Sequence, residues 1–303
     1  MANKFNRLLL GKIESTKGTD AVPVPTTDAI RYKTMDLVIN SETLTREVIK
    51  TTMGNLPHSI TKQTFELTVE FEAKGSGTAG TAPEASPIYQ CCGRDEVIVA
   101  STSVSYPPLT NGIVSSTFYV YKDGLLFKLL GAQGTLSQKY EVGQIITYTA
   151  KISAPYVAPT AVAVPTNAVY QATQPIVFDS ADSVSDGGAI KVGNLDIDDG
   201  ADIAEHFIIG EHSFDYANRD PSLKLTRDSV NTTAEWTALT ALTDVAFTIT
   251  ANSGNPGNIL TVTAPVARRR DIKYGERSNR DTLDVEYGLF ESSGDDQDTI
   301  IYT

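Results

Sequence analysis

A predicted β-meander between Val114 and Ile152 constrains the fold of this chain more than any other stretch. Three runs rich in β-branched and aromatic residues lie there, at 116–121, 125–130 and 144–150. Asp123-Gly124 separates the first two runs, and glycine supplies the positive φ that a tight hairpin turn needs. Gly131 and Gly134 are predicted to break the second run, and Gly143 allows a further bend. The stretch therefore predicts antiparallel strands with a largely apolar face at the core of the fold.

The composition of the 303-residue chain favours the same fold class. Thr, Val, Ile and Tyr are frequent, and 22 glycines and 14 prolines punctuate short runs, which is typical of antiparallel β structure. A hydrophobic content of 41% argues against disorder over the whole chain. The length suffices for one large β domain or two smaller ones. We expect a mainly β protein, an antiparallel β-sandwich or barrel with one or two short helices and an extended arm and loop.

The strand predicted at 64–72 has the clearest alternation of apolar and polar residues. Its apolar face carries Phe65, Leu67, Val69 and Phe71. Its opposite face carries Glu66, Glu70 and Glu72. Because successive side chains of a strand point to opposite faces, the first set is expected in the core and the second is expected to face water or a lumen.

Two short helices are predicted from their boundary signals. The first has Ser86 as N-cap, Pro87 at its first position and Gly93 after its end. The second has Thr232 as N-cap, with a capping box to Glu235. Each helix lies between groups of predicted strands, and in the second half residues 196–209 are predicted as one strand-like segment. The order strands, helix, strands thus occurs twice.

The chain is predicted to consist of an N-terminal arm and one β-sandwich domain. Residues 1–35 form the arm, because glycines and prolines interrupt a segment that cannot bury enough apolar surface to fold alone. The domain covers 36–303 as two pseudo-related halves, about 36–155 and 176–303, joined by a proline-rich connector. Residues 41–57 are polar and aperiodic, which predicts a long loop or an extended hairpin, and loops of that length usually have a function.

Several segments, taken in their order along the chain, resemble landmarks of a known family. They are Pro83–Gly93, Tyr121–Gly124, Gly131–Leu136 with the strand after Gly143, Asn194–Ile197, Gly257–Ile259 and Ala264-Pro265. Each segment alone contains only turn and strand chemistry. Their order and spacing together resemble the tail tube protein (major tail protein) of long-tailed bacteriophages over most of the chain.

This resemblance implies a structural function in the virion tail. Six copies would form a ring, each donating strands to a shared inner β-barrel, and rings would stack into a tube through which double-stranded DNA passes without specific binding. The loop near 41–57 would pack between stacked rings. The partners implied are further copies of the chain, a tape measure protein, a tail terminator and distal tail or baseplate proteins.

The charge of the chain is uneven along its length. Residues 1–160 carry 15 Lys and Arg against 14 Asp and Glu, whereas residues 161–303 carry 10 against 23. An acidic half has the wrong sign for tight nucleic-acid binding, which needs cations that displace counterions from phosphates. Either the near-neutral first half or the acidic second half could line a lumen, and Glu66, Glu70 and Glu72 of the first half are candidates for a lumen-facing row. Candidate contacts between subunits are Lys4, Arg7, Lys12, Thr45, Arg46, Arg268, Arg269 and Arg270.

No pattern in the sequence predicts catalysis, a cofactor or a metal. Only three histidines are present, His58, His206 and His212, and no nucleophile signature surrounds Cys91-Cys92. Asn194, Asp196, Asp198 and Glu205 have the spacing of a calcium-binding EF-hand loop. Asp199, however, replaces the glycine that such a loop requires. We expect no enzyme and no cofactor, and we attribute the acidic spacing to chance.

Synthesis in the host cytoplasm without membrane insertion is expected, because the sequence has neither a signal-peptide pattern nor an apolar run long enough to span a bilayer. Two other function classes are weighed against the tail tube. A monomeric β-sandwich could bind carbohydrate or a host surface as a decoration module. Such modules expose aromatic side chains, whereas Trp236 lies at a predicted helix position. A hydrolase on a β scaffold is disfavoured by the scarcity of histidines.

Overall fold

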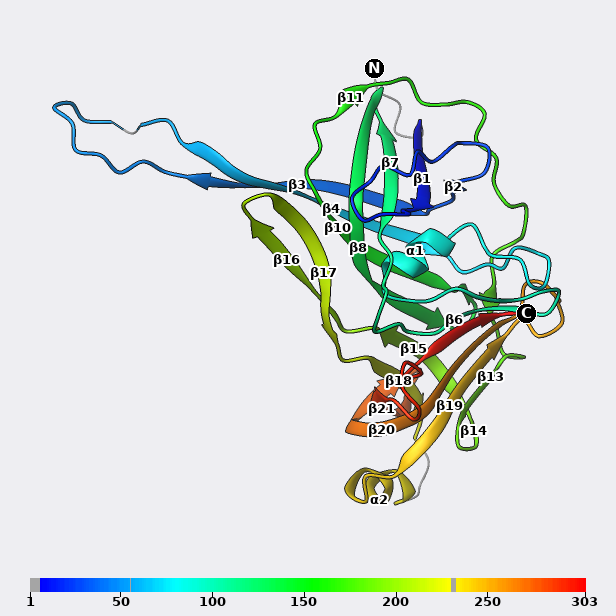
Figure 1. The fold of residues 1–303 in the computed structure, drawn as a ribbon. Coiled ribbons are helices and arrows are strands. Elements are labelled where there is room, and N and C mark those ends of the chain that lie inside the picture. The colour runs from blue at the N-terminus through cyan, green and yellow to red at the C-terminus, as the bar shows by residue number, and fades with distance from the viewer. Residues whose placement is uncertain (1–5, 55, 230–232) are drawn as a thin grey trace.

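The structure of the chain, a computed structural model, describes residues 6–54, 56–229 and 233–303. Within these ranges the protein is mainly β, with antiparallel sheets and two helices. Most strands belong to one hydrogen-bonded network, from which hairpins project (Figure 1). The fold class predicted from the meander and the composition is confirmed.

The first half of the chain builds its elements around the meander. They are β1 (Arg7–Ile13), β2 (Ala29–Ile30), β3 (Thr34–Leu44), β4 (Ser59–Glu72), α1 (Ser86–Cys91), β5 (Val97–Val99), β6 (Ser103–Tyr106), β7 (Ser116–Lys122), β8 (Leu125–Glu141), β9 (Gln144–Ile145), β10 (Thr147–Pro155) and β11 (Thr160–Ala161). The second half adds β12 (Val177–Phe178), β13 (Ser183–Asp186), β14 (Ala189–Ile190), β15 (Val192–Asp198), β16 (Ala201–Ile208), β17 (Glu211–Arg219), β18 (Ser222–Asp228), α2 (Ala234–Thr240), β19 (Asp244–Ala251), β20 (Leu260–Arg277), β21 (Arg280–Phe290) and β22 (Thr299–Tyr302).

Eight of these strands form one continuous antiparallel run. β3, β4, β10 and β8 pair in that order, and we call them set 1. β15, β18, β21 and β20 pair in that order, and we call them set 2. β8 pairs with β15 from Glu141 opposite Asn194 to Ser137 opposite Asp198. This contact, the internal junction, makes the two sets one sheet.

The two sets have the same connectivity. In each, the first strand in sequence pairs with the second, the second with the fourth, and the fourth with the third. A helix follows the second strand in both, since α1 follows β4 and α2 follows β18. The link between the first and second strands projects in both: residues 45–58 in set 1, and the β16–β17 hairpin in set 2 (Figure 1). The domain boundaries at 36–155 and 176–303 stay a prediction.

The core lies against one face of this sheet. Phe65, Leu67, Val69 and Phe71 of β4 are all buried, as their alternation predicts. The ring of Tyr89 in α1 lies 5.9 Å from that of Phe71, and its hydroxyl lies 2.9 Å from that of Tyr302 in β22. α1 therefore covers the core face of set 1 and connects it to the second half of the chain.

The meander is present, but β8 is longer than predicted. It continues for 17 residues through Gly131 and Gly134, where a break is expected from the sequence. A Cβ on Gly134 would lie 2.4 Å from the carbonyl oxygen of Lys151 in β10. This glycine therefore allows two backbones to approach closely inside a sheet, which is the other common role of glycine in a strand.

The N-terminal segment differs from the predicted arm. β1 pairs with β7 over seven residues, and Leu8, Leu9 and Leu10 are buried. The carboxylate of Glu14 accepts hydrogen bonds of 2.8 Å from the Thr117 hydroxyl and from the Gly131 backbone N–H. Because pairing with β7 gives the leucines a partner surface within the same chain, the prediction of a separate arm is wrong for the described residues from Arg7 onward.

The helix boundaries are also corrected. Ala85, not Ser86, is the N-cap of α1, and the Ser86 hydroxyl donates to Glu96 instead. The predicted cap Thr232 lies outside the described residues; α2 has Thr233 as N-cap, with no side-chain cap hydrogen bond. The carboxylate of Glu235, the predicted partner in the capping box, is paired with arginines of the sheet.

The segment predicted as one strand at 196–209 is two strands. β15 ends at Asp198 and β16 begins at Ala201. Between them, Gly200 has a φ of 55°, and a Cβ there would lie 2.2 Å from the carbonyl oxygen of Asp220. This turn directs β16 away from the sheet and into its own hairpin with β17.

Candidate assembly surfaces

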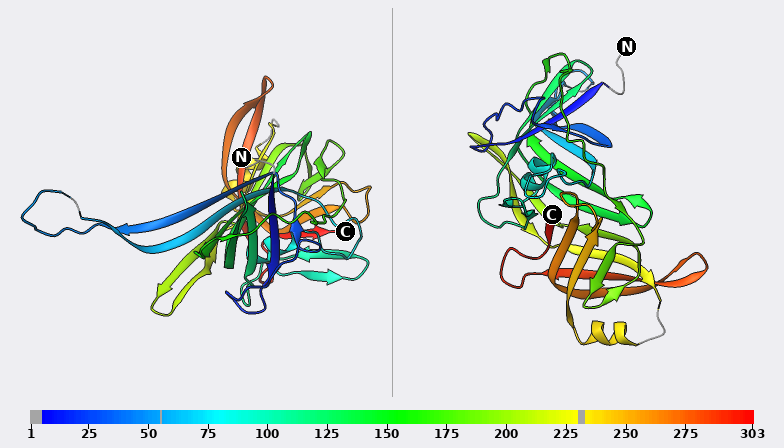
Figure 2. Two further views of the ribbon diagram at one scale, coloured as in Figure 1. Left: turned by 90° about the horizontal axis from the view of Figure 1, so that it is seen from above. Right: turned by 90° about the vertical axis from the view of Figure 1, so that its right-hand side faces the viewer.

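The most prominent surface is the hairpin of β3 and β4, which extends far beyond the body of the protein (Figures 1 and 2). The segment predicted as a loop or hairpin at 41–57 is the outer part of this hairpin, with its strands paired out to Leu44 and Ser59. The tip at 45–58 carries exposed Val48 and fully exposed Ile49 and Met53. The candidate contacts Thr45 and Arg46 lie at the start of the tip and are exposed.

A second hairpin, β16–β17, also ends in exposed apolar side chains, namely Phe207, Ile208 and Ile209. Its flank is attached to the first half of the chain. The Lys62 ammonium of β4 lies 2.8 Å from a carboxylate oxygen of Glu205, and the Tyr216 hydroxyl donates to the carbonyl oxygen of Cys92 at 2.7 Å. This hairpin was missed in the sequence because the turn at Gly200 between β15 and β16 was not recognised.

The face of the sheet opposite the core is polar across both sets. In set 1 it carries the predicted row: Glu66 accepts from Asn40 at 3.2 Å, Glu70 pairs with Lys33 at 2.7 Å, and Glu72 lies at the end of β4. The hydrogen bond from Lys33 lowers the pKa of Glu70. Directly opposed residues continue the face through Lys139, Asp196, Lys224 and Glu286. Charge therefore alternates across β8, β15, β18 and β21, whereas Asp271 of β20 lies opposite Glu286.

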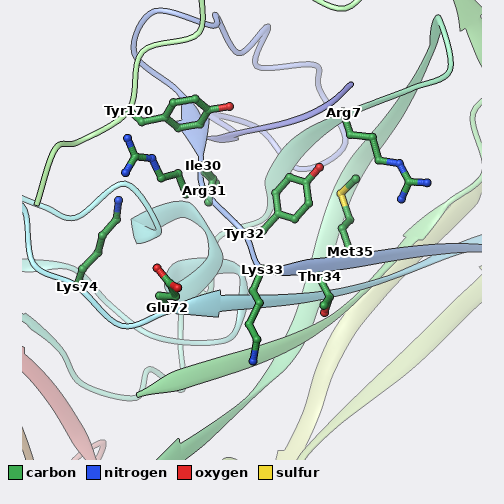
Figure 3. Close-up of a pocket in the computed structure, with 10 residues that line it drawn as sticks. All are labelled: Arg7, Ile30, Arg31, Tyr32, Lys33, Thr34, Met35, Glu72, Lys74 and Tyr170. Carbon is green, nitrogen blue, oxygen red and sulfur yellow. The ribbon is translucent and has the colours of Figure 1, made fainter. Parts of the chain in front are cut away.

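A basic cleft of about 620 Å³ lies where β3 begins. Four cations line it: Arg31 and Lys33 from the link between β2 and β3, Arg7 from β1, and Lys74 from beyond β4. The rings of Tyr32 and Tyr170 also line it (Figure 3). Arg31 lies 5.2 Å from the centroid of the Tyr170 ring. Of the N-terminal candidate contacts, Arg7 lines this cleft, Lys12 is exposed on β1, and Lys4 lies outside the described residues.

The three consecutive arginines on β20 have partners within the chain. Arg268 binds Asp244 at 2.7 and 3.0 Å, and this hydrogen bond lowers the pKa of Asp244. Arg270 binds Asp220 on the same exposed side of the strand. Arg269 is buried and pairs with Glu235 at 2.8 Å and with Asp186 at 3.0 Å. The prediction of an intersubunit contact is wrong for Arg269, because its guanidinium is enclosed by its own chain.

A second buried ion group joins the two halves and is not apparent in the sequence. Arg94 follows α1, is 3% exposed, and donates to Asp199 and, at 2.6 Å, to Asp298. The pKa of Asp199 is raised to about 7, because burial and the nearby Asp298 outweigh the lowering effect of Arg94. Burial alone would lower the pKa of Arg94, but the two carboxylates raise it above its ordinary value.

The residues weighed for chemistry are dispersed. Of the acidic cluster, Asp196 and Asp198 lie in β15, Asp199 binds Arg94, and Glu205 binds Lys62 and, at 2.9 Å, His212. In the described ranges, no three His, Cys, Asp or Glu side chains are grouped to hold a metal ion. Cys91 and Cys92 are free and buried.

Comparison with known proteins identifies the family. No curated protein matches the sequence. No helix in the described part of the chain is long and apolar enough to cross a bilayer. The family model of the phage tail tube protein matches residues 5–288, which is nearly the whole chain. The resemblance drawn from turn and strand segments is therefore confirmed, and this chain belongs to the phage tail tube protein family.

Proposed function

We propose that copies of this chain close into rings, that the rings stack head to tail into a hollow tube, and that double-stranded DNA passes through the tube during ejection into the host. Membership of the tail tube family makes the chain a structural component of the virion tail. The resemblance implies six copies in each ring, each donating strands to a shared inner barrel. Synthesis in the host cytoplasm belongs to this proposal.

The observation that carries the proposal is the eight-strand run with one apolar and one polar face. A sheet of this kind exposes unpaired backbone N–H and C=O groups along its two edge strands. Such edges favour aggregation unless they are covered. Joining such edges around a ring removes them, and a repeated head-to-tail contact forms a ring when its rotation closes. The core face would then point outward, and the polar face would line the lumen.

The charge of the polar face suits a passage for DNA. Glu66, Glu70 and Glu72 belong to it, and Lys139 and Asp196 lie directly opposite each other further along it. DNA binding depends on cations that displace the counterions of several phosphates. A surface that alternates in charge offers no continuous row of cations, so DNA would slide without being held.

The two projecting hairpins supply the contacts for stacking in this proposal. Fully exposed apolar side chains are costly in water unless another surface covers them, and the tip at 45–58 and the β16–β17 hairpin both carry such side chains. The exposed candidates Thr45, Arg46 and Lys12, and Arg7 in the basic cleft, would contact neighbouring copies. The tape measure protein, the tail terminator and the distal tail or baseplate proteins are partners by resemblance.

Size-exclusion chromatography combined with negative-stain electron microscopy of the purified protein tests this function. Rings or tubes are the expected result. A monomer at every concentration, with no assembly in micrographs, would contradict the proposal and favour the monomeric binding module.

A charge placed at the hairpin tip is expected to prevent stacking without unfolding the protein. The double variant Ile49→Asp, Met53→Asp changes two fully exposed side chains, so its free energy of unfolding should stay within about 0.5 kcal/mol of the original. Tubes should be absent from micrographs while rings persist. The matched control, Thr51→Asp with Thr52→Asp, adds the same charge to the same tip and should still form tubes. Equal tube formation by both variants would remove the tip from the stacking contact.

Removal of residues 1–35 is a different kind of change. Because β1 is paired with β7 and buries three leucines, this truncation should unfold the first half of the chain. It is therefore unsuitable as a test of stacking.

A further inference from the structure

The eight-strand run has one open edge at each end. β3 pairs with β4 on one side only among the described residues. At the other end, β19 covers the outer edge of β20 from Leu260 to Arg268. From Arg269 to Arg277 the same edge has no strand beside it in the described part of the chain. Because the run contains an even number of antiparallel strands, β20 of one copy and β3 of the next would be antiparallel neighbours in a head-to-tail ring.

Sets 1 and 2 can be aligned through one row of directly opposed residues in each. One row of directly opposed residues crosses set 1 through Thr34, Glu70, Thr149 and Ser137, and another crosses set 2 through Asn194, Thr226, Asp284 and Lys273. When the second row is laid on the first, the C-terminal ends of three of the four strand pairs coincide, whereas β3 extends further beyond its row than β15 does. β4 and β18 both end two residues beyond their row, β8 and β20 both end four residues beyond, and β10 and β21 both end six residues beyond.

Because of this correspondence, the register of the internal junction predicts the register of a second junction, between β20 of one copy and β3 of another. β20 occupies in set 2 the place of β8 in set 1, and β3 occupies in set 1 the place of β15 in set 2. The internal pair Ser137–Asp198 therefore corresponds to Lys273 with Val38, and the internal pair Glu141–Asn194 corresponds to Arg277 with Thr34. All of these residues of β20 lie on its uncovered edge.

We propose that β20 of one copy pairs with β3 of the next through Lys273–Arg277 and Thr34–Val38, and that three copies close the ring. The proposal rests on the tail tube function, adds to it the surface that joins the copies, and replaces the six copies implied by the resemblance with three. Each copy contains two sets of four strands, so three copies contribute six sets. Six copies of a protein with one such set would contribute the same number.

The side chains at the two open edges complement each other on the core face. At the internal junction, Tyr140 faces Leu195 and Gln138 faces Ile197, and all four are buried. The residue that corresponds to Gln138 at the open edge is Tyr274, which is 68% exposed with its ring 5.9 Å from that of Trp236. Its partner in the proposed register is Leu37. Pairing would cover an aromatic side chain that the single chain leaves in water.

The polar face is complementary in charge. Asp36 is exposed on β3, and the proposed register places it opposite Gly275. On β20, Lys273 and Arg277 lie two residues to either side of Gly275, so one carboxylate would lie diagonally between two cations. Lys273 also lies 2.7 Å from Asp271 of its own strand, and Asp36 would be its second acidic neighbour. Cross-strand and diagonal pairs of opposite charge stabilise a sheet and help to fix its register.

The number of strands agrees with the size of DNA. With strands roughly 4.8 Å apart and tilted by about 36°, a barrel of 24 strands measures roughly 45 Å between backbones. Inward side chains leave a bore of about 35 Å, whereas the 16 strands of two copies leave about 20 Å and the 48 strands of six copies about 80 Å. A double helix is roughly 20 Å wide. Three copies are therefore the smallest ring that leaves DNA room for its water and ions.

Cysteine crosslinking tests the register and the copy number together. Directly opposed residues of antiparallel strands lie within reach of a disulfide, and the natural Cys91 and Cys92 are buried. In the double variant Val38→Cys, Lys273→Cys, mild oxidation should produce covalent dimers and trimers on a non-reducing gel, with the ladder ending at three. Each single variant should remain monomeric.

Two matched pairs control this experiment. Ser137→Cys with Asp198→Cys occupies the corresponding positions of the internal junction and should form a crosslink within one chain. Lys151→Cys with Lys273→Cys uses a polar-face residue in the middle of set 1 and should form none. A ladder that continues to six would overturn the copy number. Tubes that form in micrographs while the Val38–Lys273 pair stays uncrosslinked would overturn the register.

The outcomes separate this inference from the proposed function. Covalent trimers without tubes would support the edge pairing and contradict the stacked conduit, while the absence of both would overturn both. As a second variant, Tyr274→Glu alters an exposed side chain and should fold normally but lose ring formation. Tyr274→Phe should retain it. Unimpaired rings in Tyr274→Glu would contradict the proposed pairing.

Discussion

Replacement of Arg94 by methionine is expected to lower the free energy of unfolding by about 3–5 kcal/mol, the usual cost of removing one partner from a buried ion group. Arg94 is the cation between Asp199 and Asp298, and all three side chains are buried. Methionine fills a similar volume but leaves two carboxylates without a counter-charge. The loss should weaken the contact between the halves, because Arg94 comes from the first half and both aspartates from the second.

Urea unfolding followed by circular dichroism measures this effect. Arg31→Met is the matched control, because the exposed Arg31 also loses its charge there, and it should change stability by less than about 1 kcal/mol. If Arg94→Met were no less stable than this control, the ion group would not contribute to holding the halves together.

Replacement of Asp199 by asparagine is expected to stabilise the protein at pH 8 and to flatten its pH dependence. The pKa of Asp199 is raised by burial to about 7, from an ordinary value of 3.8. The unfolded chain therefore releases this proton at lower pH than the folded chain does. Below pH 3.8 the folded and the unfolded chain both hold the proton, and the free energy of unfolding has its full value. This free energy falls as the pH rises toward 7. A pKa difference of this size corresponds to a loss on the order of 4 kcal/mol.

Asparagine at this position resembles the protonated carboxyl group and keeps a polar partner for Arg94. The measurement is a series of urea unfolding curves between pH 4 and pH 8 for the original protein, Asp199→Asn and the control Asp202→Asn, which alters an exposed carboxylate. The free energy of unfolding of the original protein should fall with rising pH more steeply than that of Asp199→Asn. The control Asp202→Asn should have the same pH dependence as the original. A parallel pH dependence in the original and in Asp199→Asn would show that another group is responsible.

The sequence predicts those parts of this fold that local chemistry determines. The alternation at 64–72 identifies the core face of β4 because a strand with one buried face must alternate. Asp123-Gly124 marks the β7–β8 turn because both residues adopt a positive φ there. Between them, these local signals and their order along the chain lead to the correct family.

The parts that were wrong depend on partners distant in sequence. Gly134 looks like a strand breaker until Lys151 of β10 lies against it, and the leucines of β1 look like part of an arm until β7 lies beside them. Arg94 is separated from Asp298 by 204 positions. Arg269 looks exposed in a run of three arginines, yet strand alternation turns it toward Glu235 beneath the sheet. No local pattern contains these contacts.

The internal junction has a consequence for how a tube wall would grow. Sets 1 and 2 belong to one polypeptide, so β15 stays near β8 at an effective concentration on the order of millimolar, however dilute the protein is. Every second junction between strand sets in the proposed tube wall would then form while a single chain folds. Only the junctions between copies would depend on protein concentration. A dilution series should therefore dissociate the wall into single chains that each keep sets 1 and 2 joined, and never into separate halves.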